Sequence, residues 1–448
     1  MRKVLLSTFG SLGDLHPFIA LAQRLQAHGH RPLLATLADY RTAVLEAGVE
    51  FHPVRPSIAQ LLAQQHLDER EFARRVMRDT HFLFHGLIFP YLRAAYADLL
   101  PVMQDAALVL TSALAFAARL GAERLAVPQM AVVLQPMMFL SAYDPPCLAE
   151  APWLAPLLRG LGPVGTAPLL RLLQWGLTRA AGPIDDIRRE LGLAPLASDP
   201  LFRGAYSAHG TLALYSPRLA APQPDYPPRT LLAGFAFYDG ATDGATCLEP
   251  QLEHFLASGP APLVFTLGSF VTRDAGAFFE VSAQVARRLG RRAVLVGALG
   301  PGTAAASLRR DDSILACGYA PYSALFARAA AIVHQGGIGT AAQALRAGKP
   351  QLIVPFYGDQ PDNARRIARL GVARTLAPAH YRTGPAVHAL RRLLDETHHS
   401  ERAAALGREI AQENGAERAA QLVDRVLAGV YRGGTAAQAL TSTSDPWR

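Results

Sequence analysis

The sequence predicts an α/β protein made of two doubly wound, Rossmann-like domains that face each other across a cleft. A length of 448 residues suits two domains, because single hydrophobic cores stop growing at about 250–300 residues. Short apolar segments, typical of buried parallel strands, alternate with segments whose apolar residues follow helical spacing. The same alternation starts again after a proline-rich stretch, which predicts a second domain of the same kind.

The first domain is expected over residues 1–216. Residues 4–7 form an apolar strand, and a glycine-containing turn follows it. The helix expected at Pro17–His28 has proline in its first turn and ends at Gly29. A second strand is expected at residues 31–36. Further strands are expected at 108–111 and 129–134, and long helices around 67–100 and 165–191.

Five prolines between positions 217 and 228 predict an interdomain linker at 217–230. The second domain is then expected over residues 231–432. Whether its final helix packs on the first domain is left open. Its strands are expected at 263–267, 293–297, 314–316, 331–334 and 352–354. The segment 433–448 is rich in Gly, Ala, Thr and Ser, and we expect it to be mobile.

Composition limits the classes of function. Apolar residues make up 50% of the chain and charged residues 18%, which favours large buried cores over disorder. The net charge of +8 suits an anionic ligand or an anionic membrane surface. Basic residues occur as arginine pairs on expected helices and are not interleaved with aromatic residues, which argues against nucleic-acid binding.

Cysteine usage and hydropathy predict a cytoplasmic protein. The three cysteines are far apart and form neither a disulfide framework nor a zinc site. The N-terminal apolar run is too short for a signal peptide. Prolines and glutamines interrupt the most apolar stretch, residues 125–142, so we expect no membrane span there. Peripheral contact with the inner membrane is left open.

The segment His334–Thr340 predicts an anion site. It places a histidine and three glycines where a short apolar strand meets a helix, and the N–H groups and dipole of such a helix start favour phosphate. A plain tight turn is the alternative. Asp359 and Gln360 weaken that alternative, because they come after the next strand and have the groups to bind sugar hydroxyls. The expected phosphate-binding positions are His334, Gly336, Gly337, Gly339 and Thr340.

Two further residues have a chemical and a structural interpretation. Asp14 lies in the N-terminal turn, where it either deprotonates a hydroxyl group or caps the following helix. Tyr319 follows a strand of the second domain, where its ring either stacks on a nucleobase or packs in the core. The N-terminal turn is not Gly-x-Gly-x-x-Gly, so a dinucleotide fingerprint is absent.

Two histidines on an expected helix suggest either a metal site or an acceptor pocket. His81 and His85 have the spacing of a zinc pair, but no third ligand accompanies them. Aromatic neighbours favour instead the wall of an apolar acceptor pocket, for which Phe84, His85 and Phe139 are candidates. The chain contains no Asp-x-Asp, so we expect no metal. The pyrophosphate of a sugar nucleotide would be stabilised by helix N-termini, His334 and Ser269.

Over residues 1–430 the chain resembles family 1 glycosyltransferases, which have the GT-B fold. The stretches that carry the resemblance are Gly10–Ile19, Gly234–Gly240, Pro262–Ser269, Tyr319–Pro321, His334–Gly339 and Asp359–Asn363. The resemblance implies an inverting, metal-independent hexosyltransferase without a cofactor, whose partners are a nucleotide-sugar donor and an apolar hydroxylated small molecule or lipid acceptor. It implies dTDP-rhamnose as the first choice of donor and a UDP-hexose as the second.

The resemblance also implies roles for single residues. Asp14 is implied to be the general base, and Tyr319 to stack on the donor's base. His334, the following amides and Ser269 are implied to bind the pyrophosphate, and Asp359 and Gln360 the sugar. Gln335 replaces a second histidine that is common in this branch of the family. A sterol or other natural-product glycosyltransferase, a sugar-nucleotide epimerase and a non-catalytic partner subunit are the alternatives.

Overall fold

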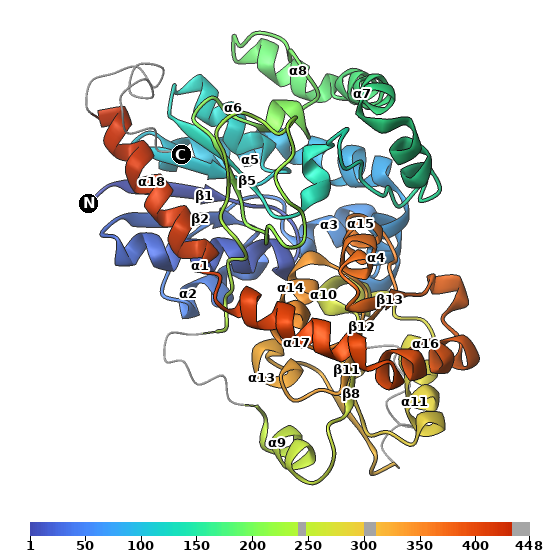
Figure 1. Cartoon of the computed structure of the whole chain (residues 1–448). Helices are drawn as coiled ribbons and strands as arrows, with labels where there is room; N and C mark the ends of the chain where they lie inside the picture. Colours follow the sequence, from blue (N-terminus) through green and yellow to red (C-terminus); the bar gives the residue numbers. More distant parts are fainter. Residues whose placement is uncertain (241–247, 300–310, 432–448) are drawn as a thin grey trace.

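Two parallel β-sheets organise the molecule, one for each domain (Figure 1). The computed structural model describes residues 1–240, 248–299 and 311–431. The first sheet has seven strands in the order β3-β2-β1-β4-β5-β6-β7, and the second has six in the order β10-β9-β8-β11-β12-β13. In each domain the chain begins at a central strand, β1 or β8, and adds strands on one side of it. It then crosses over and adds the remaining strands on the other side, which is the doubly wound arrangement. The predicted GT-B architecture is confirmed.

The N-terminal sheet consists of β1 (Lys3–Ser7), β2 (Arg31–Thr36), β3 (Glu50–Pro53), β4 (Leu108–Thr111), β5 (Gln129–Val133), β6 (Thr211–Ala213) and β7 (Thr230–Leu232). The helices of this domain are α1 (Leu12–Ala27), α2 (Arg41–Glu46), α3 (Ile58–Gln65), α4 (Glu69–Arg78), α5 (Leu92–Met103), α6 (Phe116–Arg124), α7 (Leu154–Ala180) and α8 (Gly182–Glu190). A π-helical segment, Phe82–Ile88, interrupts the helical stretch that was expected around residues 67–100.

The C-terminal sheet consists of β8 (Leu263–Thr266), β9 (Ala293–Val296), β10 (Ile314–Cys317), β11 (Ala331–His334), β12 (Gln351–Ile353) and β13 (Ala373–Thr375). The helices are α9 (Pro250–Ala257), α10 (Gly268–Val271), α11 (Phe278–Leu289), α13 (Tyr322–Phe326), α14 (Ile338–Arg346), α15 (Gln360–Arg369), α16 (Thr383–Asp395), α17 (Thr397–Ala411) and α18 (Gly415–Tyr431).

Helices cover both faces of each sheet, which explains the continuous apolar strands. In β1, the buried side chains of Val4 and Leu6 belong to one core cluster, whereas Leu5 belongs to another on the opposite face, because successive side chains of a strand alternate between faces. α18 completes the first of these clusters with apolar residues such as Leu422 and Val423. The last helix therefore packs on the N-terminal domain beside α1 (Figure 1).

The domain boundary differs from the sequence-based expectation. β7 (Thr230–Leu232) pairs in parallel with β6 and belongs to the N-terminal sheet, although residues up to 230 were expected to be linker and those from 231 to belong to the second domain. The short apolar run at 230–232 is too brief to predict a strand alone, and pairing with β6 supplies its backbone partners. The segment predicted to be mobile, 433–448, lies outside the described residues.

Ion pairs hold the two domains together on the side of the molecule away from α18. Asp274 accepts hydrogen bonds from Arg70 and Arg74 of α4 at 2.9 and 3.0 Å. Asp144 accepts from Arg366 and Arg369 of α15, and the carboxylate of Asp362 accepts from the backbone of Cys147 at 2.9 Å.

Candidate active site between the two sheets

A cavity between the domains lies at the carboxyl ends of the strands, where doubly wound sheets bind ligands. It has a volume of about 340 Å³ and is lined by both domains. The N-terminal side contributes Gly13 and His16, and the C-terminal side contributes the turns after β8, β10 and β11. Of the expected donor residues, Ser269, Tyr319, Gly339 and Thr340 line it.

The contacts of Asp14 are those of the capping role, and the residue is not among those that line the cavity. It occupies the third position of α1 in a capping box with Ser11, and its Oδ2 accepts from the backbone N–H of Ser11 at 2.8 Å and from the Ser11 hydroxyl at 3.2 Å. Both contacts are made by Oδ2, so Oδ1 is the oxygen left for a ligand. Burial raises the pKa of Asp14, which makes its carboxylate a stronger base.

The turn before Asp14 requires glycine at position 10. Gly10 has a φ of +147°, and a Cβ at this position would lie 2.3 Å from Oδ2 of Asp14. The hydroxyl of Tyr40 donates to the carbonyl of Gly10 at 2.9 Å, which fixes the turn from the other side. Gly10 thus allows the carboxylate to fold back over the turn.

His16 also faces the cavity, although no role was predicted for it. Its ring lies 5.3 Å from that of Tyr238, and burial lowers its pKa to about 4. His16 is therefore neutral near pH 7. Tyr238 and Asp239, which line the same cavity, were not predicted as site residues, because no local signal marks the crossing between the domains.

His334 does not lie where a phosphate could reach it, which corrects the expectation of direct contact. Its side chain is fully buried, and both ring nitrogens have partners. Nδ1 accepts from the N–H of Gly336 at 3.0 Å, and Nε2 lies 2.9 Å from Oε1 of Gln351. This pairing assigns the proton to Nε2, and burial lowers the pKa of His334 to about 4. The residue shapes the glycine turn from beneath.

The glycine turn after β11 packs closely against neighbouring segments of the chain. Gly336 has a φ of +88°, and a Cβ there would lie 2.8 Å from Ile353 and 3.2 Å from the carbonyl oxygen of Gln360. Gly337 is the N-cap of α14, so the free N–H groups of this helix follow it. The side chain of Gln335 extends toward α14, where its amide nitrogen lies 3.4 Å from the hydroxyl of Thr340.

Asp359 and Gln360 lie at the start of α15 but do not line the 340 Å³ cavity. Burial raises the pKa of Asp359 to about 7, and the negative charge of Asp14 contributes to the shift. The two carboxylates are thus near enough to interact across the domain boundary. Oδ2 of Asp359 accepts from Asn363 at 2.7 Å. The side-chain oxygen of Gln360 accepts from the N–H of Phe356 at 2.8 Å, so it holds the loop and is not free for a sugar.

Tyr319 and Ser269 are accessible to a ligand. The side chain of Tyr319 is 66% exposed at the cavity, which excludes the packing interpretation in this structure. Its neighbour Tyr322 is the one that packs: it stacks on Phe326 at 4.4 Å, and its hydroxyl lies 2.8 Å from that of Thr266. The exposed ring is therefore available for stacking on a base.

The three acceptor-pocket candidates do not come together. Phe139 lines a separate cavity of about 620 Å³ within the N-terminal domain. Phe139 is buried in a cluster of aromatic residues, with its ring 4.0 Å from that of Tyr226. Phe84 packs against Phe89 and Phe116 in a different core cluster. His85 is exposed and stacks on His81 at 4.3 Å. Apolar character alone did not distinguish core from pocket wall.

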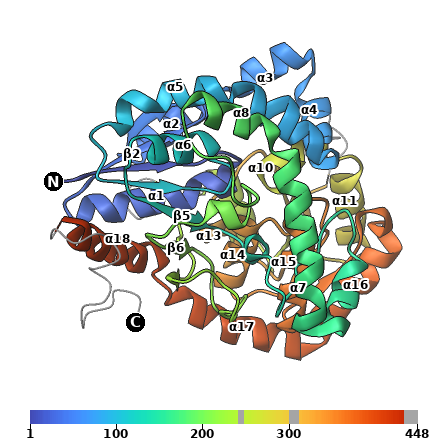
Figure 2. The ribbon, with the colours of Figure 1, turned by 90° about the horizontal axis from the view of Figure 1, so that it is seen from above.

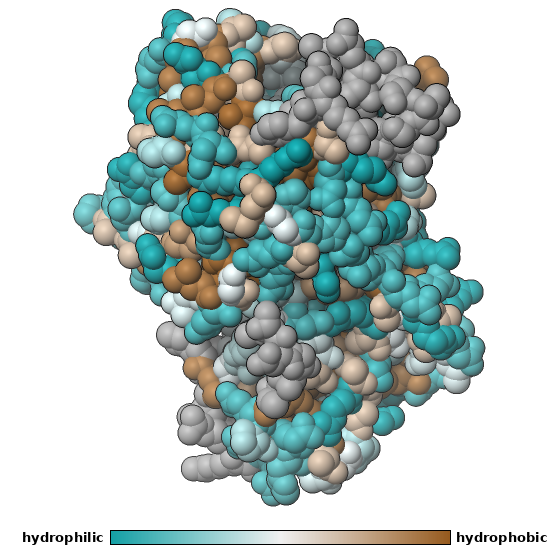
Figure 3. Space-filling view, turned by 90° about the vertical axis from the view of Figure 1, so that its left-hand side faces the viewer, coloured by the Kyte–Doolittle hydropathy of each residue, from teal (hydrophilic) through white to brown (hydrophobic). Residues whose placement is uncertain are grey.

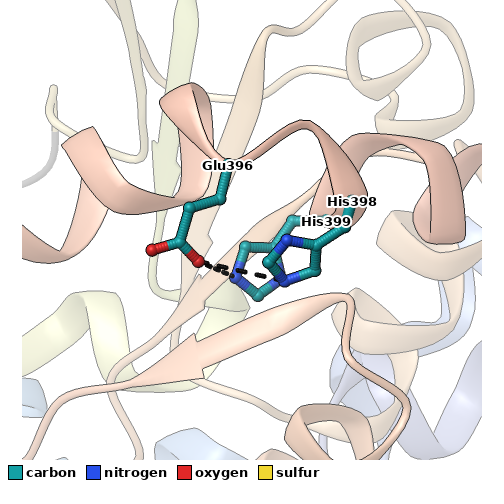
Figure 4. A group of neighbouring side chains, drawn as sticks. All are labelled: Glu396, His398 and His399. Carbon is teal, nitrogen blue, oxygen red and sulfur yellow. Dashed lines mark ion pairs between the residues drawn. The ribbon is translucent and has the colours of Figure 1, made fainter.

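One group of metal-ligand type is found among the described residues, and it lies at the start of α17. Glu396 directs its carboxylate toward His398 and His399 at 3.9 and 3.4 Å (Figure 4). Nδ1 of His399 donates to the carbonyl of Gly371 at 2.7 Å. None of these residues lines the cavity between the domains, so the group does not bear on chemistry there.

Comparisons with known proteins agree with this geometry. Residues 4–143 match the model of glycosyltransferase family 28 N-terminal domains, and residues 304–425 match that of erythromycin biosynthesis protein CIII-like C-terminal domains. The chain is 29% identical to an O-mycaminosyltylonolide 6-deoxyallosyltransferase of Streptomyces fradiae, over 94% of this chain and 97% of that one. It is 30% identical to a sterol 3-beta-glucosyltransferase of Neosartorya fischeri, over 94% of this chain but 29% of the relative's length.

Among solved structures, a spinosyn rhamnosyltransferase complexed with thymidine diphosphate superimposes with a TM-score of 0.60 at 19% identity, covering 95% of this chain and 99% of that one. The fold is that of GT-B glycosyltransferases, and the two halves of the chain are similar to the family 28 N-terminal and EryCIII-like C-terminal domains. The class is thereby defined: the chain is a glycosyltransferase. The predicted enzyme class, a hexosyltransferase, is confirmed. Within the described residues, no helix has the length and apolarity to cross a membrane.

Proposed function

We propose that the protein transfers a sugar, with inversion and without a metal ion, from a nucleoside-diphosphate donor to a hydroxyl group of an apolar or lipid-like acceptor. The observation that carries this proposal is the close approach of the two domains beside Asp14, where a Cβ on Gly339, at the start of α14, would lie 3.3 Å from the Cα of Gly13. The cavity beside these glycines exposes Tyr319 and Ser269. This arrangement offers a base at the reacting end of the cleft and a stacking surface at the nucleotide end.

The proposed reaction proceeds by in-line displacement. Oδ1 of Asp14 takes the proton of the acceptor hydroxyl, whose oxygen forms a bond to the anomeric carbon. The bond between that carbon and the phosphate oxygen breaks, and the nucleoside diphosphate leaves with the electron pair. The N–H groups at the start of α14 stabilise the charge that develops on the leaving group. Ser11 fixes the other carboxylate oxygen during the proton transfer.

The first choice of donor is dTDP-L-rhamnose, and a UDP-hexose is the second. The first is supported by a resemblance of the sequence to the bacterial rhamnosyltransferase subunit that makes mono-rhamnolipid. It is also supported by the thymidine diphosphate bound to the spinosyn rhamnosyltransferase. The names of the relatives favour a macrolide-type or sterol acceptor as the second candidate. An epimerase would need several acidic residues in the cleft and is disfavoured, because Asp239 is the only acidic residue among the described residues that line the cavity.

Thermal-shift titration with dTDP, UDP and GDP tests the donor class. A ligand at 100 times its Kd stabilises a protein by about 2.7 kcal/mol, so the preferred nucleotide is expected to give the largest rise in Tm. Activity is expected to be unchanged by EDTA. The proposal fails if none of the three nucleotides raises Tm.

The variant Asp14→Asn tests the base. Its amide oxygen can still accept the capping bonds from Ser11, but the amide cannot accept the proton, so kcat is expected to fall at least about 100-fold with an unchanged thermal shift by the nucleotide. Asp395→Asn, which replaces an exposed carboxylate on α16, is the matched control and is expected to retain activity. Turnover near that of the parent in Asp14→Asn would exclude the role.

A further inference from the structure

The helix α7 and the residue before it expose an apolar surface that no other part of the described protein covers. Six large side chains spaced along this segment are between 47% and 89% exposed: Trp153, Leu157, Leu161, Val164, Leu172 and Trp175. Trp153, Leu157 and Leu161 recur every four residues, which places them on one side of α7 before its break at Gly162. A single exposed leucine is ordinary, whereas a continuous apolar surface marks an interaction site.

The charges of this segment are all positive. Between Glu150 and Asp185 the chain has no acidic residue, and its only charged residues are Arg159, Arg171 and Arg179. The guanidinium group of Arg179 lies 4.7 Å from the ring centre of Trp175. Leucines flanked by tryptophans and arginines are the composition of helices that lie in the interface of an anionic bilayer. A protein partner with an acidic surface would not need so many exposed leucines.

The shape of α7 favours lying on a bilayer over crossing it. The helix is broken at Gly162, where φ is +63° and ψ is 179°, and Pro163 follows directly. Figures 1 and 2 place α7 on the outside of the molecule, away from α18. By contrast, the face that carries α18 is mainly hydrophilic, with apolar residues in small groups (Figure 3).

We propose that α7 docks the enzyme on the surface of an anionic phospholipid bilayer. The inference rests on the proposed function, since it supplies the place from which a lipid-like acceptor would come. Apolar side chains enter the boundary between headgroups and acyl chains, and the arginines pair with lipid phosphates. The chain's net charge of +8 adds long-range attraction to such a surface.

The segment that leads into α7 is connected to the sugar end of the site. Asp144 is paired with Arg366 and Arg369 of α15, and the backbone of Cys147 donates to Asp362. The same helix begins at Gln360, beside Asp359. A bilayer under α7 would therefore lie next to the element that is expected to hold the sugar, which allows an amphiphilic acceptor to reach the cleft without crossing water.

Vesicle binding tests the proposal without substrate. Of the three tryptophans in the chain, Trp153 and Trp175 border or lie in α7 and Trp447 is near the C-terminus, so Trp447→Phe provides a background in which emission reports on this surface alone. With vesicles of phosphatidylglycerol and phosphatidylcholine we expect a blue shift of emission and quenching by brominated acyl chains. With phosphatidylcholine alone we expect binding about tenfold weaker or more.

The variant Val164→Asp/Leu172→Asp is expected to reduce binding to the mixed vesicles at least about tenfold, because each substitution puts a charge into the interface. Leu45→Asp is the matched control, since Leu45 is 51% exposed on α2, and it is expected to bind like the parent. Arg171→Gln/Arg179→Gln should weaken binding and remove most of its salt dependence.

Three outcomes overturn the proposal: no blue shift with either vesicle, equal binding of Val164→Asp/Leu172→Asp and the parent, or a dimer in light scattering that these substitutions dissociate. Nucleotide-induced thermal shifts measured on the same variants separate the two hypotheses. Parent-like shifts with lost vesicle binding support docking through α7. Absent shifts in the parent itself would contradict the proposed transferase, whereas a blue shift with the mixed vesicles would still support docking.

Discussion

Asp14 and Asp359 belong to different domains but are near enough for their charges to interact, and each is held by a neighbour on its own domain. Ser11 binds Oδ2 of Asp14, and Asn363 binds Oδ2 of Asp359. Burial raises the pKa of both groups. A cleft that brings two such groups together suits a reaction in which one of them accepts a proton.

The titration of Asp359 has a measurable consequence for stability. Its pKa is raised from 3.8 to about 7, so the stability that it contributes is fully present below its unfolded pKa and is lost as the pH rises through about 7. Asp359→Asn removes this titration and keeps an acceptor for Asn363. We expect the Tm of the variant to rise relative to the parent between about pH 4 and pH 8. Parallel Tm curves for the two proteins would contradict the shifted pKa, and Asp395→Asn controls for loss of a surface charge.

His334 is expected to contribute to stability rather than to ligand binding. Its two ring nitrogens bind Gly336 and Gln351 in the core, so His334→Ala removes two buried hydrogen bonds and leaves a cavity. We expect the free energy of unfolding in urea to fall by about 2–4 kcal/mol. If the variant keeps its stability but loses affinity for the nucleoside diphosphate, the result would contradict the structural role and support the direct phosphate contact that the sequence predicted.

At the scale of elements, α18 is attached to the N-terminal domain by a cluster of charges. His28, which follows α1, places Nδ1 at 2.6 Å from Asp424 and Nε2 at 2.9 Å from Glu417. His30 lies 2.6 Å from the other oxygen of Asp424. The hydrogen bond to Asp424 is the largest of the effects that raise the pKa of His28. A helix from the end of the chain is thereby joined to the first strand–helix unit.

This attachment is expected to weaken as the pH rises. Because the folded pKa of His28 is raised, its contribution is fully present below the unfolded value of 6.5 and is lost as the pH rises through the higher folded value. Asp424→Asn should reduce that dependence. Hydrogen exchange of α18 amides, measured from about pH 6 to pH 9 and corrected for intrinsic rates, is expected to show it. Glu401→Gln on α17 is the control, and identical profiles in Asp424→Asn and the parent would argue against the attachment.

At the scale of the whole molecule, the two domains meet glycine against glycine. A Cβ added to Gly339 would lie 3.3 Å from the Cα of Gly13, so the first turns of α14 and α1 are nearly in contact. Any side chain here must separate the domains slightly. Because the base and the donor site belong to different domains, their distance depends on this approach.

Gly339→Ala is therefore expected to lower kcat/KM about fivefold to tenfold with little change in Tm, since small displacements of reacting groups are costly for catalysis but not for folding. Gly384→Ala, at a helical position with no atom within 4 Å of the added Cβ, should leave kcat/KM unchanged. Steady-state kinetics with both variants provide the test, and equal values would show that the contact does not limit domain approach.

The sequence by itself determined the features that depend on local patterns. Apolar strands alternating with amphipathic helices predicted both doubly wound sheets, and the position of Tyr319 just after a strand predicted its place at the cavity. These succeed because the signal lies within one strand–turn–helix unit. β7 was missed because three residues carry too little periodicity, and its place depends on the distant strand β6.

The tertiary structure decided which side chains are accessible. His334 and Phe139 both have suitable chemistry for a site, yet one is paired within the core and the other is packed among aromatic rings. The reverse holds for His16, which folding places in the cavity, and for the leucines of α7, which folding leaves exposed. Burial is set by contacts between segments far apart in the chain, and no local pattern encodes those contacts.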